Sequence, residues 1–142
     1  MEYRDYLKRQ IEEAGRVLAR IMADLTGFKN QGKVNEGIEN VQLTLKSELD
    51  LDLDHLMSIS SGELIDELAD NEKLQEENFD QLADLLTEMA DGLMWQNQTE
   101  KAKDLYEKIL ILYQHLDQTA TAFSFNRHAK MEKVSQKLQE IG

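Results

Sequence analysis

The 142-residue sequence predicts an all-α protein, and three features carry this prediction. It contains no proline, a residue concentrated at turns, strand edges and helix starts, although average usage of about 5% would give about seven. Apolar residues recur every three or four positions over most of the chain, which is the period of one helix face. The length and the 41% content of hydrophobic residues fit one domain, residues 1–142, with a single core.

The first two predicted helices form an antiparallel hairpin over residues 3–49. The first has its apolar stripe from Tyr3 to Phe28 and ends near Gly32, because glycine readily takes the left-handed conformation that stops a helix. The second runs from Asn35 to about Leu49.

A middle unit, residues 50–73, follows this hairpin. From Leu49 to Asp54 leucine and aspartate alternate strictly, a pattern typical of a strand. A strand needs a partner for its backbone groups and the sequence offers none, so we expect an extended linker or distorted turn over 50–59. Ser60 and Glu63 have the spacing of a capping box, which predicts a short helix of about ten residues after them.

A second hairpin is expected over residues 74–118, followed by a C-terminal helix over 123–141. The first helix of this hairpin spans Leu74 to Gln96, and Thr99 is the expected N-cap of the second. Phe123 or Ser124 starts the last helix. The sequence thus predicts about six helices in antiparallel hairpins and no sheet.

The two predicted hairpins align with each other at an offset of 65 positions. Each has a tight turn, a small residue early in its second helix and a larger apolar residue four positions later. The matched residues are Gly32, Gly37 and Val41 in the first hairpin and Asn97, Ala102 and Tyr106 in the second. The small residues let the paired helices approach closely, because no long side chain separates them.

This hairpin resembles the tetratricopeptide repeat, whose hallmark is the same set of positions. The family's early tryptophan and closing proline are absent, and Asn97 stands where the family has a turn glycine. The resemblance implies a right-handed stack of hairpins with 50–73 as a shortened, degenerate unit. The opening Tyr3–Glu12 segment and Leu51–Asp54 are also similar to a group of small acidic bacterial proteins of unknown function, which implies a bacterial, cytoplasmic protein and no activity.

Charge and composition exclude several classes of function. With 28 acidic and 16 basic residues the net charge is −12, the wrong sign for neutralising phosphates, so we expect neither nucleic acid nor membrane as partner. The absence of cysteine excludes thiol catalysis and cysteine-ligated metals. The N-terminal residues lack the pattern of a signal peptide, and the longest apolar run, Ile109–Tyr113, is too short to span a bilayer. We therefore expect a cytoplasmic protein.

Catalytic and metal-binding motifs are also missing from the sequence. Asp50, Asp52 and Asp54 alternate like the ligands of a calcium loop, but the loop's required glycine and glutamate are replaced by His55 and Ser61. No serine triad or glycine-rich phosphate loop is present. We expect a non-catalytic protein with no metal and no cofactor.

The acidic residues are concentrated in one part of the chain. Residues 48–100 contain 16 acids and one base, Lys73, a net charge of −15, and the remainder of the chain carries +3. Such asymmetry is typical of a surface for a basic partner, and equally of a face that serves only solubility. Arg127, Lys130, Lys133 and Lys137 in the last helix are expected to lie beside the acidic middle of the same molecule, or to form a basic surface for an outside ligand.

The candidate site is a stripe on the helix that contains Trp95. At 100° per residue Trp95 projects away from the core face, in line with three acids, and in tetratricopeptide proteins this face lines a peptide groove. The resemblance implicates Asp84, Thr87, Asp91, Met94 and Trp95, and the projection adds Glu88 to the same stripe. An acidic surface with a tryptophan suits lysine or arginine side chains. The alternative is that Trp95 is buried against the C-terminal helix or a second copy of the chain.

Two functions follow from this pattern. The first is a non-catalytic protein–protein interaction module that binds a basic peptide or partner on an acidic groove and associates into homodimers. The second is a helical bundle that binds a small molecule or metal through inward carboxylates, with enzymatic activity as one form of it. The direction of Asp84, Glu88 and Asp91 discriminates between them: toward solvent in the module, toward one another in the bundle.

Overall fold

The computed structural model describes residues 2–142, and these residues contain seven α-helices, one short 3-10 helix and no strand. The all-α prediction is therefore confirmed. The elements in chain order are α1 (Glu2–Asn30), α2 (Val34–Leu49), α3 (Leu53–Ser58), α4 (Ser61–Ala69), η1 (Glu76–Asn78), α5 (Phe79–Trp95), α6 (Thr99–Thr119) and α7 (Phe125–Ile141).

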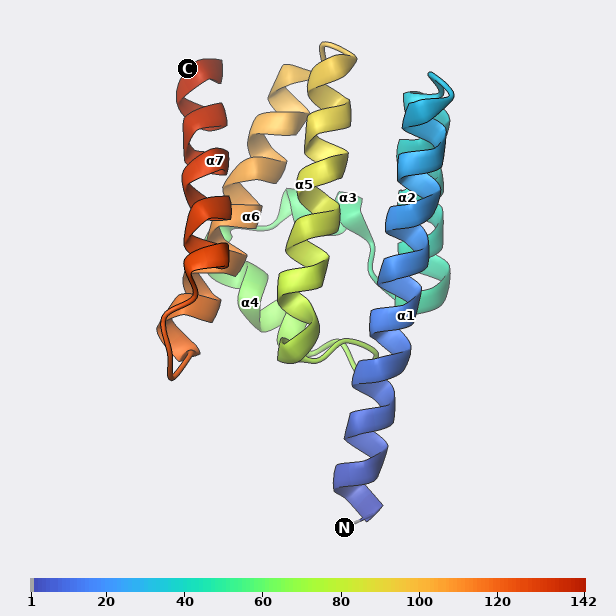
Figure 1. The fold of residues 1–142 in the computed structure, drawn as a ribbon, viewed down its shortest axis with the longest axis vertical. Helices are drawn as coiled ribbons and strands as arrows, with labels where there is room; N and C mark the ends of the chain where they lie inside the picture. Colours follow the sequence, from blue (N-terminus) through green and yellow to red (C-terminus); the bar gives the residue numbers. More distant parts are fainter. Residues whose placement is uncertain (1) are drawn as a thin grey trace.

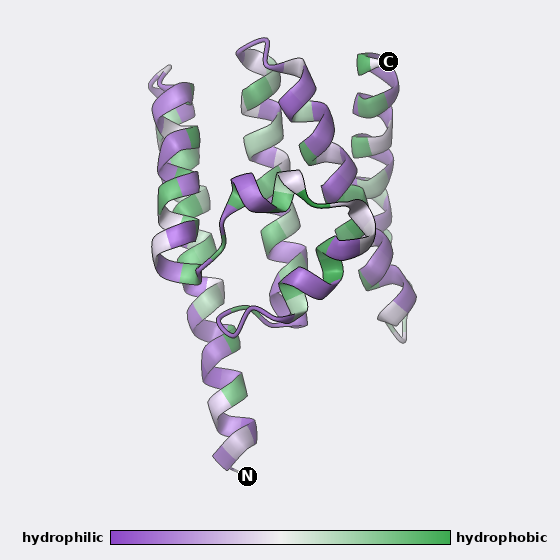
Figure 2. Cartoon of the chain, turned by 180° about the vertical axis from the view of Figure 1, so that it is seen from behind, coloured by the Kyte–Doolittle hydropathy of each residue, from purple (hydrophilic) through white to green (hydrophobic). Residues whose placement is uncertain are grey.

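The long helices form two layers (Figure 1). Helices α1, α5 and α7 lie side by side in front, and α2 and α6 lie behind α1 and α5 as the return arms of two hairpins. Seen from behind, the short helices α3 and α4 cross from α2 to α6 (Figure 2). The segment between the two hairpins therefore covers the back of the molecule and leaves the front of α1, α5 and α7 open.

Helices α1 and α5 run in the same direction, as two hydrogen bonds to α1 show, one from η1 and one from α5. The side-chain amide of Asn78 donates to the backbone carbonyl of Ile11 (3.0 Å). The side-chain amide of Gln81 donates to the backbone carbonyl of Gly15 (2.8 Å). The sequence separations are 67 and 66 residues, close to the 65 at which the two hairpins align. Asn78 is the one buried polar residue in the described chain, 2% exposed, so its hydrogen bonds fix this register.

The core is built around α5. Its neighbours are α6, α1 and α2, and more than half of its 17 residues are buried. The helix is therefore apolar around most of its circumference, which leaves one narrow polar stripe. Its buried residues are Phe79, Leu82, Ala83, Leu85, Leu86, Met89, Ala90, Gly92 and Leu93.

Close helix contacts occur where the alignment of the hairpins places small residues. A Cβ atom added to Gly37 of α2 would lie 2.9 Å from the Cβ of Phe28 and 3.0 Å from Leu25 Cδ1, both on α1. Ala102 of α6 has no exposed surface. The turns also correspond, because Gly32 (φ 73°) and Asn97 (φ 61°) both take the left-handed conformation that glycine and asparagine tolerate.

The middle of the chain differs from its prediction. Residues 53–58 form helix α3 rather than an extended linker or distorted turn. The Asp52 carboxylate accepts hydrogen bonds from the backbone N–H groups of Asp54 and His55, so it caps this helix. The alternating leucines have the period of a strand, but they do not form one. Leu51, just before α3, and Leu53 and Leu56, within α3, are all buried in the core.

Two helix starts also differ from their predictions. The helix expected from Leu74 begins at Phe79, because η1 precedes it with a reciprocal capping box between Gln75 and Asn78. The N-cap of α6 is Gln98, not Thr99. Ser60 lies at the N-cap of α4 as expected, although its side chain makes no capping bond there. Ser124 does cap α7, accepting from the N–H of Arg127 (3.1 Å).

The contact at Gly37 yields a stability prediction with an internal control. Gly37→Ala should lower the free energy of unfolding by about 1–2 kcal/mol, because the overpacking cost of about 1–3 kcal/mol exceeds the gain of up to about 1 kcal/mol in helix propensity. Gly27→Ala, in a helical position with no atom within 4 Å of the added Cβ, should raise it by up to about 1 kcal/mol. Denaturant unfolding measures both, and equal stabilisation of the two variants would contradict the close approach of α1 and α2.

Candidate interaction site

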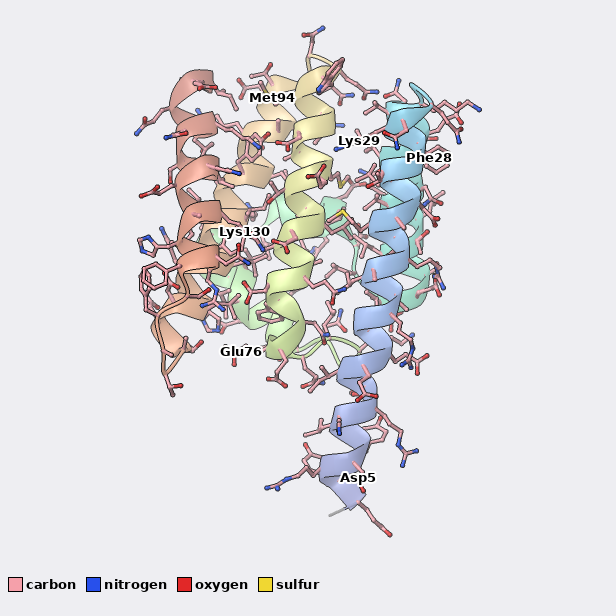
Figure 3. The ribbon with its side chains drawn as sticks, in the orientation of Figure 1. Asp5, Phe28, Lys29, Glu76, Met94 and Lys130 are labelled. Atoms are coloured by element: carbon pink, nitrogen blue, oxygen red, sulfur yellow. The ribbon has the colours of Figure 1, made fainter. Side chains whose placement is uncertain are left out.

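The six residues predicted for the site lie along the one polar stripe of α5, between α1 and α7. Asp84, Thr87, Glu88, Asp91 and Met94 are half-buried, whereas Trp95 is 83% exposed. Figure 3 shows Met94 near the end of α5 at the front of the molecule, and it shows Lys130 of α7 and Lys29 of α1 on opposite sides of α5. Trp95 is thus not buried against the C-terminal helix of its own chain.

Two of the aspartates each bind a tyrosine and a lysine. Asp84 accepts a hydrogen bond from the Tyr113 hydroxyl (2.8 Å) and pairs with Lys130 (2.9 Å). We call this set the lower triad; its residues come from α5, α6 and α7.

The upper triad repeats the same chemistry two helical turns further along α5. Asp91 accepts from the Tyr106 hydroxyl (2.5 Å) and pairs with Lys137 (2.7 Å). The Lys137 ammonium also lies 5.7 Å from the centre of the Tyr106 ring, within cation–π range. Because each triad member is seven residues from its counterpart, the two triads form a ladder that joins α5, α6 and α7.

Arg127 extends the ladder toward the start of α5. Its guanidinium donates to both carboxylate oxygens of Asp80 (3.0 and 2.7 Å) and also contacts Asp117 of α6 (3.4 Å). The side chain of Arg127 is only 13% exposed. The hydrogen bonds that Arg127 donates to Asp80 stabilise the charged guanidinium and raise the pKa of Arg127 above its ordinary value, despite the opposing effect of burial.

The remaining acid of the stripe faces the opposite neighbour. Lys29 of α1 pairs with the Glu88 carboxylate (2.9 Å) and donates to the Glu88 backbone carbonyl (2.7 Å). Thr87 donates to the carbonyl of Ala83 (2.8 Å), one turn earlier in the same helix. The acids of the stripe are therefore neutralised by lysines of the two neighbouring helices. Lysines of α7 pair with Asp84 and Asp91, and Lys29 of α1 pairs with Glu88.

These pairs confirm that cations of the last helix lie beside the acidic middle of the same molecule. The prediction holds for Arg127, Lys130 and Lys137. Lys133 is exposed, and no ion pair of Lys133 is present in the described part of the chain. The three paired cations lie on the face of α7 that is turned toward α5 and α6.

An open pocket of about 550 Å³ adjoins the upper triad at the end of α5. Helices α5, α6 and α7 all contribute to it, and it combines exposed apolar groups with both signs of charge. Its lining residues are Asp91, Met94, Trp95, Thr99, Tyr106, Lys137, Glu140 and Ile141. We call it the Trp95 pocket; of the six predicted residues it brings together Asp91, Met94 and Trp95.

The aspartates of the calcium-like motif serve separate structural roles. Asp50 pairs with Lys73 (3.4 Å), and Asp52 caps α3. Residues 2–142 contain no group of three or more histidine, aspartate or glutamate side chains placed to hold a metal ion. Nor does any helix within that range have the length and apolar character needed to cross a membrane.

Sequence reasoning missed the part played by two tyrosines. Tyr106 and Tyr113 fall on the apolar stripe of α6, so the periodicity indicates only that they face inward. Their rings are buried as expected, but their hydroxyls hold Asp91 and Asp84. The available signal was the seven-residue spacing shared by the tyrosines, the aspartates and the lysines.

Comparison of this chain with protein-family models, with curated proteins and with solved structures finds no match.

The tyrosine hydroxyls make folding sensitive to alkaline pH. Burial first, and then the hydrogen bond to an aspartate, raises the pKa of Tyr106 and of Tyr113 well above the ordinary value of 10.0. Because the folded-state pKa is the higher one, the stabilisation is complete below about pH 10 and is lost as the pH rises above it.

We therefore expect the free energy of unfolding to fall above about pH 10, and this fall to be smaller in the variant Tyr106→Phe, Tyr113→Phe. At neutral pH each substitution should cost about 1.5–3 kcal/mol, since each removes a hydrogen bond to a charged group. Urea unfolding at a series of pH values measures both effects. An unchanged alkaline slope in the double variant would contradict the assignment of these two hydroxyls.

Proposed function

We propose that this protein is a non-catalytic interaction module that binds a basic segment of a partner protein at the Trp95 pocket. One observation carries the proposal: a tryptophan that is 83% exposed, at the edge of an open pocket on the front of the molecule. Exposed apolar groups rimmed by polar ones are typical of binding surfaces, and tryptophan is among the residues that contribute most to protein interfaces.

The chemistry around the pocket favours a cationic side chain of the partner. The indole ring offers a face for a lysine or arginine, and Met94 and Ile141 offer apolar contact for the aliphatic part of such a side chain. Glu140 supplies a carboxylate at the rim. Asp91 is already bound to Lys137, so Glu140 is the carboxylate of the pocket lining that is left for an incoming cation.

Ion pairs with the neighbouring helices restrict the part of the predicted groove that can attract a basic partner. Asp84 and Glu88 are neutralised by Lys130 and Lys29, so attraction for a basic partner is strongest toward the end of α5. The carboxylates of the stripe each face a lysine rather than one another. This arrangement favours the module over the bundle with inward carboxylates.

The resemblance to tetratricopeptide repeats supports the same proposal. In such a stack the front layer, here α1, α5 and α7, is the layer that receives peptides. With this resemblance we also propose a right-handed stack, a bacterial cytoplasmic setting, and homodimer formation as a second use of the exposed Trp95.

Trp95 is the only tryptophan, so its fluorescence reports on the pocket directly. Short peptides of equal length with arginine or lysine at alternate positions should shift its emission, and the effect should weaken as salt is added. Peptides with glutamate at those positions should leave the emission unchanged. A cationic peptide that binds nowhere near Trp95, or does not bind at any ionic strength, would contradict the proposal.

Two variants assign the binding to particular side chains. Trp95→Ala should weaken the binding of a labelled cationic peptide by about 3- to 30-fold, because a partly desolvated cation–π contact contributes that much to affinity. Fluorescence anisotropy of the labelled peptide measures this affinity. Glu140→Gln should weaken it by a smaller factor and reduce its salt dependence. Glu63→Gln, on the exposed part of α4, is the matched control and should bind like the unmodified chain.

A further inference from the structure

Helix α7 is attached to the rest of the molecule by little apolar burial. Among its 17 residues only Val134 is buried, 1% exposed, and its contacts with the core are otherwise made by partly buried side chains. By comparison, more than half of the 17 residues of α5 are buried. The apolar contribution to holding α7 in place is therefore small, because it scales with the area removed from water.

Its charged contacts, in contrast, are numerous and regular. Arg127 pairs with Asp80, Lys130 with Asp84 and Lys137 with Asp91, at sequence separations of 47, 46 and 46 residues. The nearly constant separation means that α7 runs parallel to α5 and in fixed register. Half-buried ion pairs of this kind determine which helix binds and in what register more than they contribute to the free energy of folding.

The surface that receives these cations is built by α5 and α6 without α7. Tyr113 and Tyr106 of α6 hold Asp84 and Asp91 of α5 by hydrogen bonds of 2.8 and 2.5 Å. The two carboxylates are thus fixed in position by a part of the core that does not depend on the lysines. A pre-ordered pair of carboxylates is suited to a cationic helix, because little further ordering is needed when it binds.

The connection to α7 is short and exposed. α6 ends at Thr119 and α7 begins at Phe125, and residues 120–123 between them are exposed. The helix can therefore leave its place without unfolding a buried segment. Its advantage over a free helix with the same contacts is the effective concentration that this connection gives it.

We propose that the α5–α6 surface beneath α7 is a docking surface for a basic amphipathic helix of a partner protein, and that α7 is its resident occupant, which the partner displaces. This inference rests on the proposed function only for the basic character of the partner. It concerns a different site, because Lys137, Glu140 and Ile141 of α7 line the Trp95 pocket and leave it when α7 is displaced. The partner helix carries cations at the spacing of Arg127, Lys130 and Lys137, with apolar residues between them at the spacing of Met131, Val134 and Leu138.

The test uses the full chain and two fluorescent peptides. The first peptide is residues 123–142 of this chain; the second is an unrelated helical sequence that keeps only the spacing of its cations and apolar residues. Both should bind weakly to the unmodified chain, because α7 occupies the surface. Both peptides should bind at least about 10-fold more tightly to the double variant Lys130→Glu, Lys137→Glu than to the unmodified chain, because Asp84 and Asp91 repel the α7 of that variant.

Matched controls isolate the ladder from general charge effects. Lys133→Glu makes one substitution of the same kind on the exposed side of α7 and should bind like the unmodified chain. A peptide with glutamate at positions 130 and 137 should not bind to any of the variants. If the double glutamate variant loses helix content by circular dichroism, Lys130→Gln, Lys137→Gln removes the attraction without repulsion and should show the same order of affinities.

Three outcomes would overturn the inference. In the first, α7 is released, as shown by faster proteolysis at residues 120–123, and neither peptide binds. In the second, the variant becomes a dimer by light scattering and only the 123–142 peptide binds, so that the occupant is a second copy of the chain. In the third, cationic peptides shift Trp95 emission while α7 keeps its protection from proteolysis, which leaves the proposed function standing without displacement.

Discussion

The structure depends on one constraint, the burial of α5 on three sides. Contact with α6, α1 and α2 covers most of the helix and leaves a single stripe on which polar residues can lie. The acids of α5 therefore share this stripe, where they would repel one another unless neutralised. Cations on both neighbours, Lys29 of α1 and the basic face of α7, supply that neutralisation, so the packing of α5 decides how α1 and α7 are placed.

The same constraint separates a rigid part of the molecule from a loosely held one. Gly37 of α2 packs closely against α1 within the first hairpin, and Gly92 of α5 packs against Val34 and Ile38 of α2, which joins the two hairpins. The buried side-chain amide of Asn78 adds a hydrogen bond to α1. Helix α7 has one buried side chain and a set of ion pairs. Interactions of this second kind respond to salt and to competing charges far more than apolar packing does, which is why the two binding proposals concern this edge.

Particular residues show where sequence patterns misled. The leucine–aspartate alternation around Asp52 has the period of a strand, yet the Asp52 carboxylate caps a six-residue helix. A helix this short has too few turns for its period to be visible, whereas a cap of one hydrogen-bonded side chain can define its start. Similarly, Leu74 fits the apolar period of α5 but precedes it, because the Gln75–Asn78 capping box begins a separate turn.

By itself the sequence determined the helical class, the two hairpins and the outward direction of Trp95, because these follow from local periodicity and from the residues that stop helices. It also indicated that the cations of the last helix belong beside the acidic middle. Only the tertiary structure decided which cation meets which acid, and that Tyr106 and Tyr113 share those acids. Such pairings join residues 15 to 59 positions apart, and the register between helices is set by core packing that no local pattern encodes.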